Sequence, residues 1–238
     1  MTSWAGDLHL GDGWLCYRGP LGGAQPHAHH AVQVCLSESP FQLVDGSGAA
    51  VEARSAVIPA DAVHGLNGRG QAATLLYLPR LRSSAVGQDP ADWVAAASHL
   101  GIAGPGEGVD LGGWASAIAV RLGAMDPERD ALIAAAMDQA RAFLPGRARL
   151  AEVAASVGLS TSGLSHRFTR TVGVPWRVWV LGERLTAASR IVAGGGTLTD
   201  AAHGAGFADS SHLTRTFRRM FGIAPSEVAA VVRWHVHG

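Results

Sequence analysis

Side chains that bind transition metals gather in the N-terminal third of the chain. The set consists of three histidines and one glutamine, namely His27, His29, His64 and Gln33. In an extended segment residues two apart share a face, so His27, His29 and Gln33 would point one way and His30 the other. Three imidazoles suit Zn, Ni, Cu or Fe, and an amide oxygen is a weak neutral ligand. The pattern is therefore compatible with a divalent transition-metal site.

This pattern resembles the two metal motifs of the cupins, His-x-His followed four residues on by Glu, and then Pro-x-Gly-x-x-His. The chain departs from it twice, with Gln33 in place of the glutamate and Asp61 in place of the glycine. Three interpretations stay open: a metal site, a metal-free pocket for an organic effector, or histidines with a structural role only. Cys35, on the same predicted face, is expected to be a small buried hydrophobe.

A repeated unit occupies the C-terminal part of the chain. Its glycines and apolar residues recur 48 or 49 positions later: Leu150, Ala154, Gly158 and Leu159 as Leu198, Ala202, Gly206 and Phe207, then Leu164, Phe168, Gly173 and Val174 as Leu213, Phe217, Gly222 and Ile223. A fixed offset means two copies of one unit. Each copy predicts a helix, a sharp turn at glycine and a second helix opened by small polar residues. This is the plan of a helix-turn-helix motif.

The second helix of each copy is expected to enter the major groove of DNA. Ser160 would cap the first of these helices, and a capping box at Thr197 and Asp200 would open the second copy. The residues expected to face inward are Leu164, Phe168, Leu213 and Phe217. The outward residues expected to contact DNA are Ser162, Ser165, His166, Arg170, Ser210, Ser211, Arg215 and Arg218. A long helix from Trp176 to about Val192 would hold the two reading helices about 34 Å apart, one turn of DNA.

Charge is divided unevenly along the 238 residues. Residues 1–125 carry 6 Arg against 10 acidic residues, a net −4, whereas residues 126–238 carry 13 Arg against 9, a net +4. The positive half holds the repeats, which favours DNA as a partner. The two cysteines cannot form a disulfide framework, and the N-terminus shows neither a basic leader nor a long apolar stretch. We therefore expect a soluble, cytoplasmic protein with no membrane partner.

The periodicity of apolar residues changes near the middle of the sequence. Short apolar runs at 32–36, 41–44, 56–58 and 73–78 alternate with turn signals and predict a small β-sandwich or barrel. Helical periodicity follows after Pro90, and Asp126 with Pro127 could open a further helix. We therefore expect two domains, 1–125 and 126–238. An apolar stripe of Leu111, Trp114, Ile118 and Leu122 would either pair with a second copy or cover its own barrel.

The C-terminal residues resemble the DNA-binding domain of AraC/XylS-type transcription regulators. The resemblance rests on residues 150–154, 157–160, 164–168, 184–185, 187–188, 206–207, 209–211, 213–219 and 221–226. It implies a two-domain α+β protein, with an N-terminal cupin-like β-barrel and dimerisation helices, and a C-terminal all-α domain with two helix-turn-helix units. It implies base contacts from Ser162, Ser165, His166, Ser210, Ser211 and Arg215. Many members carry Arg where this chain has His166.

The same resemblance implies the partners: double-stranded DNA, a second copy in a homodimer, a small-molecule or metal effector, and RNA polymerase if the protein activates. Two other functions compete. A metal-dependent cupin enzyme fused to a DNA-binding domain is disfavoured by the missing glutamate. A DNA-repair protein would need an alkyl-accepting cysteine, and neither Cys16 nor Cys35 lies in a suitable motif. We expect a ligand-responsive regulator with no catalytic residues.

Overall fold

The computed structural model describes residues 4–11, 13–78, 86–87, 89–123, 130–146 and 149–237. By contacts the chain divides into two compact units. The first combines Met1–Pro79, Ser83–Gly123 and Thr214–Gly238, and the second combines Arg80–Arg82 with Ala124–Leu213. The end of the chain thus packs with the N-terminal residues, although the second sequence repeat continues across Leu213 into Thr214. The domain limits expected from the sequence, 1–125 and 126–238, do not follow the contact units there and stay a prediction.

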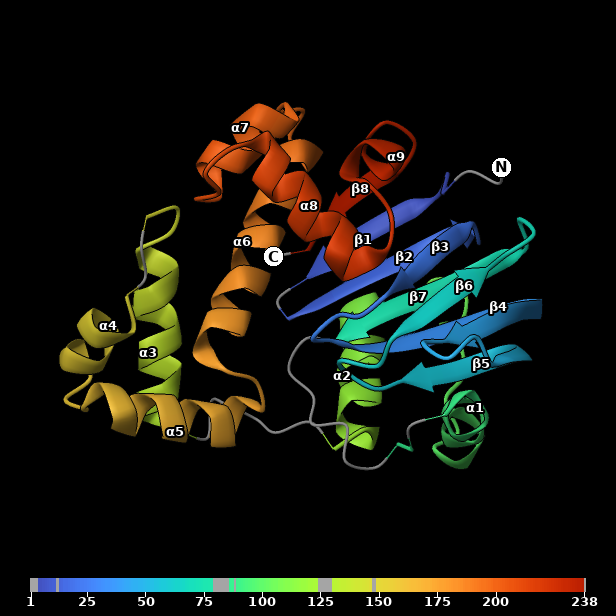
Figure 1. Ribbon diagram of the computed structural model, residues 1–238, viewed down its shortest axis with the longest axis horizontal. Helices are drawn as coiled ribbons and strands as arrows, with labels where there is room; N and C mark the ends of the chain where they lie inside the picture. Colours follow the sequence, from blue (N-terminus) through green and yellow to red (C-terminus); the bar gives the residue numbers. More distant parts are fainter. Residues whose placement is uncertain are drawn as a thin grey trace. The chain divides into compact units, whose positions relative to one another are not determined.

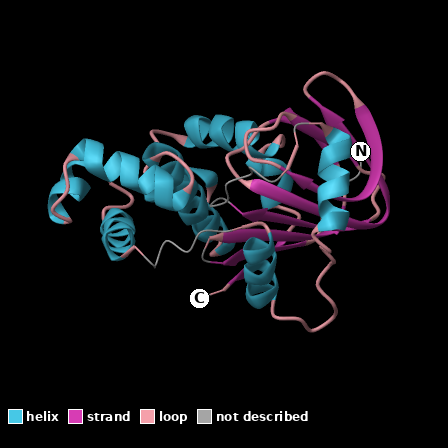
Figure 2. Cartoon of the chain, turned by 90° about the horizontal axis from the view of Figure 1, so that it is seen from below, coloured by secondary structure: helices cyan, strands magenta, loops and turns pink. Residues whose placement is uncertain are grey.

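One twisted sheet forms the centre of the first unit, drawn in magenta in Figure 2. Its strands are β1 (Asp7–Gly11), β2 (Trp14–Pro20), β3 (Gly23–His27), β4 (Val32–Asp45), β5 (Ala50–Ile58), β6 (His64–Asn67), β7 (Ala72–Leu78) and β8 (Arg233–Val236). Their order is β3-β6-β4-β7-β2-β1-β8, and β5 pairs with β4. Neighbours are antiparallel apart from β1 and β8, which run parallel.

The apolar runs of the sequence supply this sheet. The runs at 32–36 and 41–44 lie in a single strand, β4, whose register against β5 shifts between Leu36 and Phe41. At the following turn, Asp45 Oδ1 accepts hydrogen bonds from the amides of Ser47 and Ala49 at 2.9 and 2.8 Å. This turn places the strands side by side and so fixes the register of the residues along β4.

Two helices cover the sheet of the first unit. Helix α1 (Pro90–His99) packs on β4 and β5, and α2 (Leu111–Arg121) packs on β2. In the predicted stripe, Leu111, Ile118 and Leu122 are only 6%, 3% and 7% exposed within their own chain. The stripe therefore covers its own sheet, and the interpretation of this face as a dimer interface is wrong.

Five helices, α3 to α7, make up the described part of the second unit, and helix α8 begins in it. They are α3 (Ala131–Ala142), α4 (Leu150–Ser156), α5 (Thr161–Val172), α6 (Trp176–Ala193) and α7 (Leu198–Gly204). Helix α8 (Ser210–Phe221) begins in this unit and ends in the first, where α9 (Pro225–Ala229) follows (Figure 1). None of the described helices combines the length and apolar character needed to cross a membrane.

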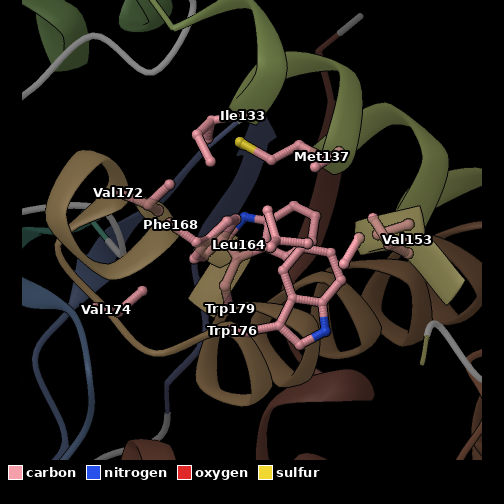
Figure 3. Packing of buried hydrophobic residues seen from close by; sticks show 12 residues of the cluster. Ile133, Met137, Val153, Leu164, Phe168, Val172, Val174, Trp176 and Trp179 are labelled. Atoms are coloured by element: carbon pink, nitrogen blue, oxygen red, sulfur yellow. The ribbon is translucent and has the colours of Figure 1, made fainter. Parts of the chain in front are cut away.

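Aromatic residues form the core of the second unit (Figure 3). The Phe168 ring meets the Trp176 and Trp179 rings edge-on, with centroids 5.0 and 5.5 Å apart. Ile133 and Met137 of α3 pack against the same cluster. Helix α3 begins at Ala131 with Asp130 as its N-cap. The expected helix start at Asp126 and Pro127 lies outside the described part of the chain. The Asp130 carboxylate that caps α3 also accepts hydrogen bonds from Arg167 of α5.

Candidate functional site

The two helix-turn-helix motifs share one turn geometry. Gly158, between α4 and α5, and Gly206, between α7 and α8, both have positive φ, 70° and 78°. The amides of the next residues, Leu159 and Phe207, each donate to the carbonyl five residues earlier, at 2.8 Å in both copies. The left-handed backbone at this position explains why both copies keep glycine there. The repeat in the sequence therefore corresponds to a repeat in the structure.

The first reading helix, α5, has its expected cap and inner face. Ser160 Oγ accepts a hydrogen bond from the Gly163 amide at 3.0 Å, and Leu164 and Phe168 are fully buried. The predicted contact residues on its other side are exposed at Ser162, His166 and Arg170 and half-buried at Ser165.

Arg167 is the arginine of α5 that the expected DNA contacts leave out. Its Nε and Nη2 donate to Asp130 at 2.7 and 2.9 Å, so this guanidinium joins the reading helix to the start of α3. Beside Arg167, the pKa of Asp130 is lowered. This pair orients α5 and makes Arg167 a positioning residue.

The second reading helix, α8, presents its polar side in the same way. Ser211, Arg215 and Arg218 are exposed and Ser210 is half-buried. The predicted capping box before it is confirmed, because Thr197 and Asp200 bond reciprocally at the start of α7. The expectation that Phe217 is buried is only partly right. Its side chain is half-buried, and its ring is tilted against that of Phe221 with centroids 4.5 Å apart, whereas Thr216 is 4% exposed.

The predicted metal ligands come together in the first unit, although by another route than one extended strand. His27 ends β3, His29 lies in the connecting loop, and β4 begins only at Val32. Antiparallel pairing of β3 with β6 places His27 directly opposite His64. The ligand atoms of the three histidines all lie within 4.8 Å of one another, and this is the one such group of His, Cys, Asp and Glu in the part of the chain that the structure describes.

Asp61 explains how the chain reaches this arrangement without the glycine of the cupin pattern. Its φ is +66°, the left-handed conformation that aspartate tolerates better than most residues. Its amide donates to the His29 carbonyl at 2.8 Å, and its carboxylate pairs with His30. The backbone conformation that glycine would provide is therefore kept, and it holds the loop that carries His29.

Backbone carbonyls fix the orientation of all three imidazoles. The Nδ1 atoms of His27, His29 and His64 lie 2.8, 2.8 and 2.9 Å from the carbonyl oxygens of Gln25, Ala31 and Ala62. A carbonyl only accepts, so each Nδ1 carries the proton and each Nε2 presents a lone pair. Burial lowers the pKa of all three imidazoles, that of His29 to about 4, so a second proton is disfavoured.

Gln33 lies at the centre of these lone pairs. Its Oε1 is 2.9 Å from both His29 Nε2 and His64 Nε2, and its amide nitrogen donates to the Tyr77 hydroxyl at 3.2 Å. In this orientation the Nε2 atoms of the three histidines and the Oε1 atom of Gln33 converge, each with a lone pair and with no proton between them. Such a group of lone pairs is suited to ligating a cation. If the amide turns over, its NH₂ group satisfies His29 and His64, but His27 Nε2 stays buried without a partner. A bound cation would meet the lone pairs of all three imidazoles together.

Tyr77 is the residue of this site that the sequence did not indicate. It lies on β7, and it meets Gln33 because those two residues pair directly across β4 and β7. Burial raises its pKa, so the hydroxyl stays neutral. Cys35 is fully buried with a raised thiol pKa, as expected for a small hydrophobe.

Comparison with known proteins agrees with the fold and with the repeated motif. A family model described as a helix-turn-helix domain matches residues 153–230. The crystal structure of ToxT from Vibrio cholerae O395 is 12% identical, covers 92% of this chain and 98% of its own, and has a TM-score of 0.55. That of wild-type ToxT from Vibrio cholerae strain SCE256 bound to an unsaturated fatty acid is 11% identical, covers 92% and 95%, and has a TM-score of 0.53.

At these identities the two structures show a shared fold alone. No curated protein matches the sequence. The family match covers both helix-turn-helix units, including the part of α8 that lies in the first unit. The chain therefore has an N-terminal β-sheet domain followed by a helical domain, and residues 153–230 match the family model of a helix-turn-helix domain.

Proposed function

We propose that the protein is a sequence-specific transcription regulator whose N-terminal domain senses a divalent transition metal. The observation that carries the DNA-binding part is the pair of reading helices, each with a buried apolar face and an exposed polar one. On α8, Arg215 and Arg218 lie on the exposed side. An arginine in the major groove donates two hydrogen bonds to guanine, so Arg215 is our choice for a base-reading residue.

The test of DNA binding uses the full chain, because residues 214–238 pack with the N-terminal unit. Selection from random duplexes would supply the preferred site. We expect Arg215→Ala to weaken binding to that site by about 1–3 kcal/mol and to relax preference at one base pair. Arg190→Ala on α6 is the matched control, because it removes the same charge from an exposed helix position outside both reading helices. Equal effects of the two variants would refute the assignment of α8.

The observation that carries the metal is the His27 Nε2 atom. It is buried, it has no hydrogen-bond partner, and it faces two further imidazole lone pairs and the Gln33 oxygen. Three neutral imidazoles with carbonyl-bound Nδ1 atoms are the arrangement in which proteins hold Zn, Ni, Cu or Fe. The gap between atoms within 4.8 Å of one another has room for one ion and none for an organic effector.

Metal uptake is tested by native mass spectrometry of the full chain reconstituted with Zn²⁺. We expect one tightly bound ion in the wild type and none in the triple variant His27→Ala, His29→Ala, His64→Ala. The sharper variant is His27→Ala alone, since its Nε2 has no partner to lose in the metal-free protein. His30→Ala is the control, because His30 lies in the same loop but pairs with Asp61. A wild-type protein that takes up no Zn²⁺, Ni²⁺, Cu²⁺ or Fe²⁺ would refute the metal site.

A second candidate ligand is an organic anion. A hollow of about 490 Å³ in the first unit has two arginines, Arg18 and Arg54, and one acidic residue, Glu38, in its lining, together with apolar residues such as Ile102 and Pro105. This volume is in the range of about 300–1,000 Å³ of small-molecule sites. Its ligand would be a carboxylate or phosphate with a hydrocarbon part. An Arg18→Ala, Arg54→Ala variant that keeps effector-dependent regulation would exclude this hollow.

The enzyme alternative has less support from the described residues. A catalytic metal needs a coordination position that substrate can reach, and His29, His64 and Gln33 are 1%, 0% and 0% exposed. We expect the protein to act in the cytoplasm, where it meets DNA, and to contact RNA polymerase if it activates. We also expect a homodimer, through a surface other than the buried stripe of α2.

A further inference from the structure

The C-terminal end of α8 lies on the histidine cluster. Phe221, the last residue of this helix, meets the Tyr77 ring edge-on, with centroids 5.5 Å apart and an interplanar angle of 82°. Tyr77 is hydrogen-bonded to Gln33, which lies between His29 and His64. One chain of three contacts therefore connects the proposed metal ligands to the end of the second reading helix.

Gly222, the next residue, makes a closer contact. A Cβ atom at this position would lie 2.6 Å from His27 Nδ1 and 2.7 Å from the Gln25 carbonyl oxygen. These two atoms form the hydrogen bond that fixes the tautomer of His27. The Gly222 backbone thus packs against the group that orients one metal ligand, with no room for a methyl group.

The segment beyond Gly222 is anchored on the same sheet. Strand β8 pairs in parallel with β1, beside which it lies in Figure 1. The Arg233 guanidinium makes two hydrogen bonds to the Asp7 carboxylate, at 2.8 and 2.5 Å. Helix α8 is therefore fixed at its C-terminal end to the sheet that carries the histidines, while its first residues belong to the helix-turn-helix of the second unit.

We infer that the end of α8 is the element that reports metal occupancy, through Gly222 on His27 and Phe221 on Tyr77; this inference rests on the proposed metal site. His27 is the imidazole whose Nε2 has no partner until an ion binds. An ion that fixes His27 also fixes the surface against which Gly222 packs, and so favours the docked position of α8. Linkage is reciprocal: if metal binding favours the docked position of α8 by a given factor, then loss of docking weakens metal binding by up to that factor.

The experiment measures both directions of this coupling in the full chain, with Zn²⁺ as the probe. By hydrogen exchange with mass spectrometry, Zn²⁺ should slow exchange in peptides covering residues 214–223 by at least about fivefold, the lower end of typical couplings. In a competition titration, Gly222→Ala should bind Zn²⁺ at least about fivefold more weakly. Gly48→Ala is the matched control: Gly48 has φ +89° in the same unit, but an added Cβ there meets no atom within 4 Å.

Phe221→Leu is the second variant, which keeps the apolar volume and removes the ring contact with Tyr77. It should also weaken Zn²⁺ binding, and it decides the question if Gly222→Ala does not fold. Zn²⁺ that binds without changing exchange at residues 214–223, or with equal affinity to wild type and both variants, would overturn the inference and leave the metal site standing. A wild-type protein that binds none of Zn²⁺, Ni²⁺, Cu²⁺ and Fe²⁺ would overturn both.

Discussion

Gln33→Leu should make the fold of the first unit depend on metal. Gln33 is fully buried, and in the metal-free protein its amide, turned over, donates to His29 and His64 and accepts from the Tyr77 hydroxyl. Leucine fills a similar volume but offers no hydrogen bond. Without metal, the two imidazole lone pairs and the Tyr77 hydroxyl would all be left buried and unsatisfied.

The magnitude follows from counting these groups. Each unsatisfied buried group costs about 1–3 kcal/mol, so the metal-free variant should lose about 3–9 kcal/mol. When Zn²⁺ binds, it takes both imidazole lone pairs, and the Tyr77 hydroxyl alone remains without a partner. The stabilisation that Zn²⁺ provides should therefore be larger in the variant by up to about 2–6 kcal/mol, less the contribution of the Gln33 oxygen as a weak neutral ligand. Each kcal/mol corresponds to about 2–4 °C in Tm for a protein of this size.

The assay is thermal unfolding of wild type and variant with and without Zn²⁺, followed by circular dichroism. Gln42→Leu is the control, since Gln42 lies on the same strand and bonds only to Asn67 at the surface. A Zn²⁺-induced shift in Gln33→Leu that is no larger than in wild type would show that the imidazole lone pairs do not meet the ion. The hydrogen-bond accounting of the cluster would then be wrong.

Four further outcomes are expected. Burial lowers the pKa of all three imidazoles, that of His29 to about 4, so Zn²⁺ affinity should begin to fall at a lower pH than it would for solvated imidazoles; an affinity that falls through about pH 6.5, the value for a solvated imidazole, would contradict the buried cluster. Burial also lowers the pKa of His9 to about 4, so the unfolded chain binds more protons between about pH 4 and 6.5; urea denaturation should show stability falling as pH falls through this window, less so in His9→Gln. Ile118→Glu should unfold the first unit, because Ile118 is 3% exposed; a folded variant that sediments as a monomer would restore the dimer interpretation. A double-mutant cycle of Asp130→Ala and Arg167→Ala should give a coupling of about 0.5–3 kcal/mol, whereas additive effects would deny the pair a role in holding α5.

Local rules were enough to predict the helix-turn-helix units. Their turns need positive φ at Gly158 and Gly206, their helices need small polar caps, and their inner faces need residues four apart, all of which are visible within about twenty residues. Apolar runs predicted β4, β5 and β7, but no run marked β1, β2, β3 or β6. Local rules failed where a contact depends on distant chain segments: Tyr77 reaches Gln33 only through sheet register.

Strand β8 is the clearest example of an element that depends on a distant segment of the chain. Its four residues, Arg233–Val236, carry no strong strand pattern, and their partner strand lies at the other end of the chain. His9, His235 and His237 therefore gave no signal in the sequence, although His9 stacks on His235 and lies 3.0 Å from His237 across this pairing. The sequence predicted only part of the histidine cluster. Residue types identified the proposed ligands, but the alternation of residues wrongly placed His27 and His29 on one extended strand.

The two copies of the motif differ in the contacts that hold their second helices, α5 and α8, in place. In the first copy Phe168 is fully buried and Arg167 binds Asp130, so α5 is held by its own unit. The equivalent positions in α8 are Phe217, half-buried, and Thr216, and this helix finds its remaining packing on Tyr77 and His27. The first copy carries His166 where the second has Arg215, the stronger reader of guanine. On our proposal, the helix with the better base-reading residue is the one whose position depends on the proposed metal site.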